Sequence, residues 1–504
     1  MAAIYADYTR DRTGPFFGLT LRQLAAVVVT GLPVLVAINR HQWPAVLGLA
    51  GVWGVAVILV VVPIRGRSAT GWLMAALRFS LGTVTRWTSW RSRAANGQVT
   101  DPDEPDLPGV LHAIRVHDGP PQGPLNTRFA IIQDHASQVW AATAALTHPG
   151  LALADDAERT AQATGLTTLL NACARTELVS ELHLLVRSVP DDGAERQQWL
   201  ATHQAEQAPP LARTVNEQLA DMLTRASVRT ETFVTVVVPE HRLARRAKEF
   251  GRGVNGRARA LYQLMGEVEQ LLLGGMRASS VSWLTSPELA VAVRSGFAPG
   301  DRLGVVAAHA ARERDASVND TVPWSQAGPA GAELAVRHYS HDAWQSISAT
   351  LTLPAKGAGI GALAAVVVPS APAERRSLVC VFPILQETVA DRQTQNAEWM
   401  SDMGQELRNR AGVKTRAKDR TQAARTSGFD ARMNAGHALV RPYAVACVTA
   451  PAHLPITEFG GRLDASIRQA GFAPLRLDMA QDAGFAAATL PLGVGLHRGR
   501  GSGS

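Results

Sequence analysis

The segment FAIIQDHASQVWAATAAL, residues 129–146, holds the clearest pair of strands in this chain of 504 residues. Two apolar runs, 129–133 and 139–146, flank a polar turn at Asp134–Ser137. Short apolar runs bounded by turn residues are typical of buried strands. The segment therefore predicts a β-hairpin within a sheet.

Strands and helices continue to alternate after this hairpin. Asp155 or Asp156 is expected to cap a helix that runs to about Cys173. Apolar runs predict further strands at 182–189, 232–239, 347–354, 377–385, 443–451 and 474–479, and helical periodicity predicts helices at 211–226, 257–273 and 456–470. This order predicts an α+β fold, with α/β sandwich domains that have a mixed sheet and helices over one of its faces.

An acidic, proline-rich stretch at 101–109 marks the start of this globular part. We expect a first cytoplasmic α+β domain at 101–300 and a second α+β part at 301–496. A long polar helical segment, 386–435, is expected as an insertion in the second part, and 497–504 is expected to be a disordered tail.

Two apolar runs, 21–38 and 43–64, lie near the N-terminus. Each is close to the roughly 20 residues that cross a hydrocarbon core of about 30 Å. Residues 39–42 form the whole connection, so region 1–67 is expected to be a transmembrane hairpin. The alternative is a helical hairpin buried in a protein core.

The flanking cations favour an orientation with both termini and the soluble part in the cytoplasm of the cell, at its cytoplasmic membrane. Region 68–100 is expected to hold an interfacial amphipathic helix, over about 69–90, and a linker. The alternative is a helix packed on the soluble domain. Arginine and tryptophan together are typical of the headgroup level, and the expected membrane-interface residues are Arg65, Arg67, Trp72, Arg78, Arg86, Trp87, Trp90 and Arg91.

Composition limits the chemistry that the chain can carry. The net charge of +7 favours anionic partners, and nucleic acid and inner-leaflet lipid both fit. The three cysteines are widely spaced, so neither a disulfide framework nor a zinc site is expected. The glycine cluster at 356–361 lacks the Gly-Lys-Ser/Thr order of a phosphate-binding loop. We therefore expect no cofactor, no metal and no catalytic residue.

Two basic stretches are candidates for contact with a partner or with nucleic acid. A solvated helix face is the simpler interpretation, and contact with an ATPase, the membrane or DNA is the alternative. The residues concerned are Arg242, Arg245, Arg246 and Lys248 in the first stretch, and Arg408, Arg410, Lys414, Arg416, Lys418 and Arg420 in the second.

The apolar region 21–64 resembles the small VirB3-like or PrgI-like inner-membrane subunits of type IV secretion. The remainder of the chain resembles the N-terminal, non-motor region of VirB4-like secretion ATPases, in the stretches at 152–174, 182–192, 344–354 and 484–496. The chain thus resembles a group of actinobacterial integral membrane proteins of conjugative, type IV secretion-like elements.

This resemblance implies a non-catalytic inner-membrane subunit that anchors and docks a separate hexameric VirB4-like ATPase. Other secretion-channel subunits and inner-membrane lipid would be further partners. One alternative is an EccE-like membrane subunit of type VII (ESX) secretion. Another is a membrane-bound enzyme of unrecognised class, for which the sequence has no motif.

Overall fold

The computed structural model describes residues 21–61, 63–64, 67–150, 154–191, 193–203, 205, 207–226, 228–352, 361–371, 373–385 and 438–496. The chain divides into two compact units. The larger comprises Met1–Ala6, Arg86–Ile384 and Val440–Ser504, and the smaller comprises Asp7–Thr85 and Leu385–Leu439. The predicted insertion at 386–435 and tail at 497–504 lie outside the described residues.

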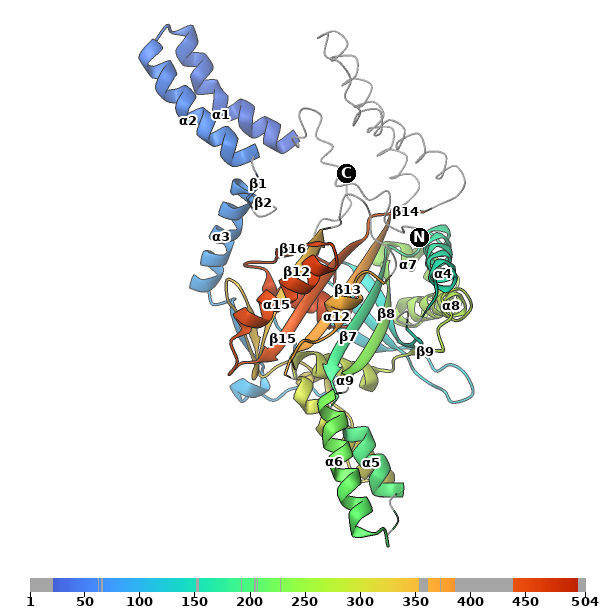
Figure 1. Cartoon of the computed structure of the whole chain (residues 1–504). Helices are drawn as coiled ribbons and strands as arrows, with labels where there is room; N and C mark the ends of the chain where they lie inside the picture. The colour runs from blue at the N-terminus through green and yellow to red at the C-terminus, as the bar shows by residue number, and fades with distance from the viewer. Residues whose placement is uncertain are drawn as a thin grey trace. The chain divides into compact units, whose positions relative to one another are not determined.

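The smaller unit contains a helical hairpin of α1 (Leu21–Asn39) and α2 (Trp43–Val61). The Trp53 indole N–H donates to the Val27 carbonyl across the pair (3.0 Å). Gly31 lies under the same indole ring, where a Cβ atom would approach it to 3.0 Å. The short strands β1 (Pro63–Ile64) and β2 (Arg67–Ser68) and helix α3 (Ala69–Val84) come next along the chain (Figure 1).

The predicted transmembrane hairpin is wrong, because none of the helices in the described part of the chain is both long and apolar enough to cross a membrane. Helix α2 ends at Val61 rather than at 64, since Pro63 cannot donate a helical hydrogen bond. Each helix has 19 residues, near the short end of the roughly 17–25 residues of a membrane-spanning helix. Helix α1 also contains Pro33.

The larger unit is built on a 14-stranded sheet with the order β3-β10-β11-β12-β15-β13-β7-β8-β6-β5-β4, while β14, β16 and β9 pair with β13, β12 and β6. Its strands are β3 (Ser89–Arg91), β4 (Ile114–Asp118), β5 (Ala130–Asp134), β6 (Val139–Thr147), β7 (Glu181–Pro190), β8 (Val228–Pro239), β9 (Ser280–Trp283), β10 (Gly331–Leu334), β11 (Tyr339–His341), β12 (Trp344–Thr352), β13 (Arg375–Leu385), β14 (Leu439–Val440), β15 (Tyr443–Pro451) and β16 (Ala473–Arg476).

The strand pairings described for this sheet are antiparallel, so the prediction of a mixed sheet is wrong. The β5–β6 hairpin forms as predicted, with Asp134 opposite Val139. The strands that follow the hairpin also pair with neighbours that run in the opposite direction, as β7 does with β8. Stretches 101–300 and 301–496 both contribute strands to this one sheet.

Helices cover both faces of the sheet rather than the single face predicted. Gly460 of α15 faces Ile347 of β12, whereas Gly484 of α16 faces the next residue, Ser348, and successive strand residues point to opposite faces. The helices of this unit are α4 (Asp156–Arg175), α5 (Ala194–His203), α6 (Pro210–Ala226), α7 (Glu240–Ala247), α8 (Gly253–Gly274), α9 (Ser286–Phe297), α10 (Arg302–Arg314), α11 (Trp324–Ala327), α12 (Ala364–Val367), α15 (Ile456–Gln469) and α16 (Gln481–Thr489).

Ten of the fourteen strands form two repeats of one topology, which we call repeat 1 and repeat 2. Strands β5 to β9, followed by α9, match β11, β12, β13, β15 and β16, followed by α16. Registers agree as well: Ala144 lies opposite Trp283, and Ala349 lies opposite Arg476. The repeats are related by a pseudo-twofold axis at the β7–β13 pair, where Leu185 lies opposite Val379.

Each repeat has its own apolar core on the same face of the sheet. In repeat 1, α4 and α8 cover Trp140, Val234 and Val236. In repeat 2, α15 and α12 cover Ile347 and Val448. Helix α4 begins where the sequence predicts, because the Asp155 carboxylate accepts from the Glu158 N–H (2.7 Å).

Two helical glycines give a matched test of the repeat 1 core. A Cβ atom on Gly165 of α4 would lie 2.1 Å from the Gly275 carbonyl oxygen, whereas one on Gly266 of α8 meets nothing within 4 Å. We expect Gly165→Ala to lower the free energy of unfolding by about 2 kcal/mol or more, because backbone must move. Gly266→Ala should raise it by roughly 0.5–1 kcal/mol through helix propensity. Denaturant unfolding measures both, and an unchanged Gly165→Ala variant would contradict this packing.

Candidate interaction surfaces

The predicted membrane-interface residues fall in both units. Arg67, Trp72 and Arg78 lie in β2 and α3 of the smaller unit, and Arg65 lies outside the described residues. Arg86, Trp87, Trp90 and Arg91 belong to the larger unit: the first two lie in the turn after α3, and the last two lie in edge strand β3. Trp90 pairs with Ala332 of β10, so it is part of the sheet.

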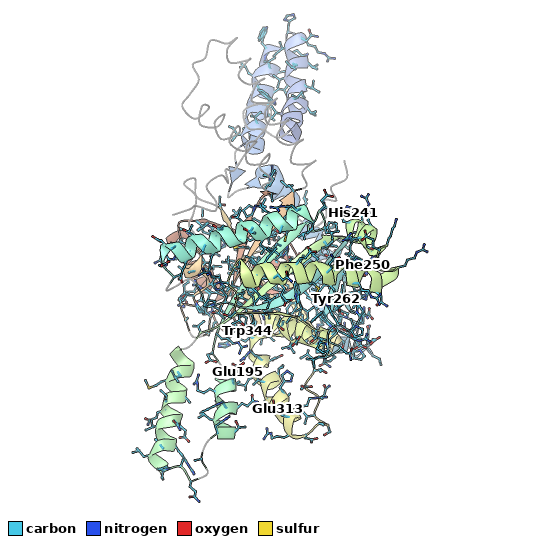
Figure 2. The ribbon with its side chains drawn as sticks, turned by 90° about the vertical axis from the view of Figure 1, so that its right-hand side faces the viewer. Glu195, His241, Phe250, Tyr262, Glu313 and Trp344 are labelled. Carbon is cyan, nitrogen blue, oxygen red and sulfur yellow. The ribbon has the colours of Figure 1, made fainter. Side chains whose placement is uncertain are left out.

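The first basic stretch forms one exposed corner of repeat 1. Arg242, Arg245 and Arg246 lie on α7, and Lys248 comes directly after it. Arg246 forms an ion pair with Glu249 (2.7 Å) and lies 5.8 Å from the centre of the Phe250 ring. Figure 2 shows His241 and Phe250 at this corner. The second basic stretch, 408–420, lies outside the described residues.

Helix α6 presents an apolar face that nothing in the described part of its unit covers. Together with α5 it leaves the sheet between β7 and β8 and projects beyond the ends of these strands (Figure 1). The large apolar side chains of this face, with their exposed fractions, are Leu211 (75%), Val215 (51%), Leu219 (49%), Met222 (68%) and Leu223 (39%). The sequence predicts the helix, but helical spacing does not distinguish an exposed apolar face from a buried one.

Salt bridges fix the base of this protrusion. Glu195 of α5 accepts from Arg302 of α10 (2.7 Å) and from Arg229 of β8. Arg196 donates to the Ala220 carbonyl of α6 (2.9 Å). Figure 2 shows Glu195 at the end of α5 next to the sheet. Helix α5 is thus linked to β8 and α10 through Glu195 and to α6 through Arg196.

A buried polar layer lies at the pseudo-twofold axis, under α9 and α16. Arg187 donates to the Ala292 carbonyl of α9 (2.8 Å), the Thr489 carbonyl of α16 (3.3 Å) and Glu231 (2.6 Å). Arg375 donates to the Ser295 carbonyl (2.6 Å). The carbonyl ends of helices carry partial negative charge, which stabilises both guanidinium groups. Burial, and then repulsion from Arg187, lower the pKa of Arg375 to about 9.

His341 belongs to the same layer and does not act as a metal ligand there. Its Nδ1 lies 2.7 Å from the Phe297 carbonyl and its Nε2 lies 2.8 Å from the Ser346 hydroxyl. A carbonyl only accepts, so Nδ1 carries the proton and Nε2 accepts from Ser346. Burial, and then the charge of Arg375, lower the pKa of His341 to about 3. Within the described ranges, no three His, Cys, Asp or Glu side chains are grouped as metal ligands would be.

A shallow groove of about 290 Å³ lies between α8 and the 122–129 loop. The Tyr262 hydroxyl donates to the Pro120 carbonyl (3.1 Å) and accepts from the Phe129 N–H (3.1 Å). The Trp283 indole donates to Glu269 (3.0 Å). These groups at the groove are therefore engaged within the protein. The exposed surfaces of α6 and α7 remain the stronger candidates for function.

Comparison with known proteins gives no family assignment: no family model matches the chain, and no curated protein matches it significantly.

The buried His341 predicts a pH dependence of stability. Above about pH 6.5 this side chain is neutral in both the folded and the unfolded state. Below that, the unfolded state binds the proton first, so stability falls as the pH drops toward about 3, by at most about 1.4 kcal/mol per pH unit. We expect His341→Gln to flatten this part of the stability profile, measured by denaturant unfolding between pH 7 and pH 4. His135→Gln, at an exposed histidine, should leave the slope unchanged, and an equal slope in all three proteins would contradict the assignment.

Proposed function

We propose that this chain is a non-catalytic structural subunit of a type IV secretion-like machine at the cytoplasmic membrane, where it docks a separate VirB4-like ATPase. The observation that carries the proposal is the exposed apolar face of α6. The resemblance of the sequence to the non-motor region of VirB4-like proteins supplies the type of machine.

The α6 face has the chemistry of a protein-docking helix. Helix α6 is 17 residues long, which corresponds to about 25 Å. Its exposed side chains recur at 211, 215, 219 and 222, the spacing with which an amphipathic helix fills an apolar groove on a partner. Leaving such a contiguous apolar surface in water is unfavourable, and surfaces of this kind commonly mark interaction sites.

The arrangement of the larger unit supports a positioning role. Salt bridges at Glu195 link α5 to β8 and α10, and Arg196 links α5 to α6, so a partner on α6 would be connected to the sheet through α5. A pre-ordered helix also loses less conformational entropy on binding than a flexible segment does. Such a subunit contributes geometry, while the partner ATPase would supply the hydrolytic chemistry.

The smaller unit supports a place in a larger assembly. Helices α1 and α2 expose several large apolar side chains, among them Val29, Leu35, Leu47 and Val52. Together with exposed Leu81 of α3 they make this unit strongly apolar on its surface. Other subunits of a membrane machine, or lipid in contact with it, would remove this surface from water.

The proposal predicts that charge on the α6 face abolishes ATPase docking. In a host that carries both genes, the Leu211→Asp, Leu219→Asp variant should retain less than about one tenth of the co-purifying VirB4-like ATPase, since each carboxylate would be buried unpaired at the interface. Its circular dichroism and melting temperature should match wild type, because both leucines are exposed.

Leu273→Asp is the matched control, since Leu273 is an exposed leucine on α8. This variant should keep the ATPase. Equal ATPase recovery with all three proteins, or none with wild type, would contradict docking through α6. Recovery of ESX core subunits in place of a VirB4-like ATPase would assign the chain to type VII secretion.

A further inference from the structure

The two repeats show which parts of repeat 1 the fold does not require. Strands β8 and β15 end at equivalent prolines, Pro239 and Pro451, which lie opposite the first residues of β6 and β12. In repeat 2, residues 452–455 alone connect β15 to α15. In repeat 1, the connection to α8 is 240–252, which includes α7. Helix α7 is therefore an addition to a connection that the fold can make without it.

The added segment and the first two turns of α8 are strongly basic, and their equivalents in repeat 2 are not. Residues 240–259 carry the acids Glu240 and Glu249, which form ion pairs with Arg257 and Arg246. Four exposed cations have no ion pair within the described part of the chain, namely Arg245, Lys248, Arg252 and Arg259. In repeat 2, the matching stretch 452–462, up to the seventh residue of α15, contains one base, Arg462, and one acid, Glu458, which form an ion pair (2.7 Å). The excess positive charge belongs to one of two equivalent corners.

The backbone of this basic corner is fixed by the fold of the chain itself. Leu243 and Ala247 of α7 are buried against the protein. The turn into α8 is tight: Gly251 has φ of 110°, and a Cβ atom on Gly256 would lie 2.0 Å from the Gly251 carbonyl oxygen. Since the cations start from a fixed backbone, less conformational entropy is lost when they bind together.

We propose that this corner binds the anionic phospholipid headgroups of a bilayer surface. Clusters of about four to eight Lys and Arg residues are typical of such binding, with the phosphates as counter-charges. Here the cations come from α7, the turn after it and the second turn of α8. The segment 240–259 holds only Phe250 and His241 as ring side chains and lacks the series of aromatic residues on which a single-strand-binding protein stacks successive bases. The surface is distinct from the α6 face, and the inference does not rest on ATPase docking.

The test is co-flotation of the purified full-length chain with vesicles of phosphatidylcholine alone, or with roughly one third phosphatidylglycerol added. We expect the anionic lipid to raise the apparent affinity by about tenfold or more, and added salt to reverse the gain. The difference in affinity between the two vesicle compositions separates the contribution of charge from any binding through apolar side chains.

Substitutions test whether the basic corner causes this gain in affinity for anionic vesicles. The variant Arg245→Gln, Lys248→Gln, Arg252→Gln, Arg259→Gln should lose it, because these exposed cations have no ion pair to break in the described part of the fold. Replacing the three arginines by lysine should retain it, since charge rather than shape is recognised. Arg462→Gln with Arg468→Gln, on α15 in repeat 2, should have no effect.

Three results would overturn the inference. One is equal binding of wild type to both vesicles. Another is an undiminished gain in the four-glutamine variant, which would place the contact elsewhere. The third is salt-sensitive binding of wild type to a double-stranded DNA fragment, lost in the four-glutamine variant, without any preference for anionic vesicles; the corner would then bind nucleic acid.

Discussion

The antiparallel pairing of β7 with β13 is the constraint on which the larger unit depends. It joins two repeats, each of which has its own apolar core, into one sheet around Leu185 and Val379. Chain segments that are remote in the sequence meet there, and carbonyls from the last turns of α9 and α16, those of Ser295 and Thr489, accept from Arg375 and Arg187. Arg187 and Arg375 neutralise the partial negative charge of these carbonyls. The junction between the repeats is therefore stabilised by buried polar groups as well as by strand pairing.

Local patterns in the sequence were sufficient for eight strands (β5 to β8, β12, β13, β15 and β16) and for the helices α4, α6, α8 and α15 of this unit. The short edge strands, and helices such as α7 and α9, were not predicted. The 129–146 hairpin and the Asp155 cap depend on neighbouring residues, and both are where the patterns place them. The repeat relation was not predictable in this way. TAALT at 143–147 and SATLT at 348–352 are equivalent segments of β6 and β12, but so short a similarity carries no weight until the strand registers show it.

The candidate surfaces were predicted only in part. The basic character of Arg245 and Lys248 is visible in the sequence, but whether such charges are paired depends on residues that folding brings near. The apolar face of α6 has the same spacing as a core helix, so its exposure is a tertiary property. Region 21–64 shows the converse error: run length alone suggested a membrane crossing, whereas the helix ends are set by local features such as Pro63.

Carrying both repeats on one polypeptide has a consequence for symmetry. A homodimer of identical halves would have the same residues at both corners, and it would dissociate on dilution. Here the corner at α7 and its counterpart before α15 have diverged, and their ratio is fixed at one to one at any protein concentration. Each copy of the chain therefore has a defined polarity, with one modified and one unmodified corner.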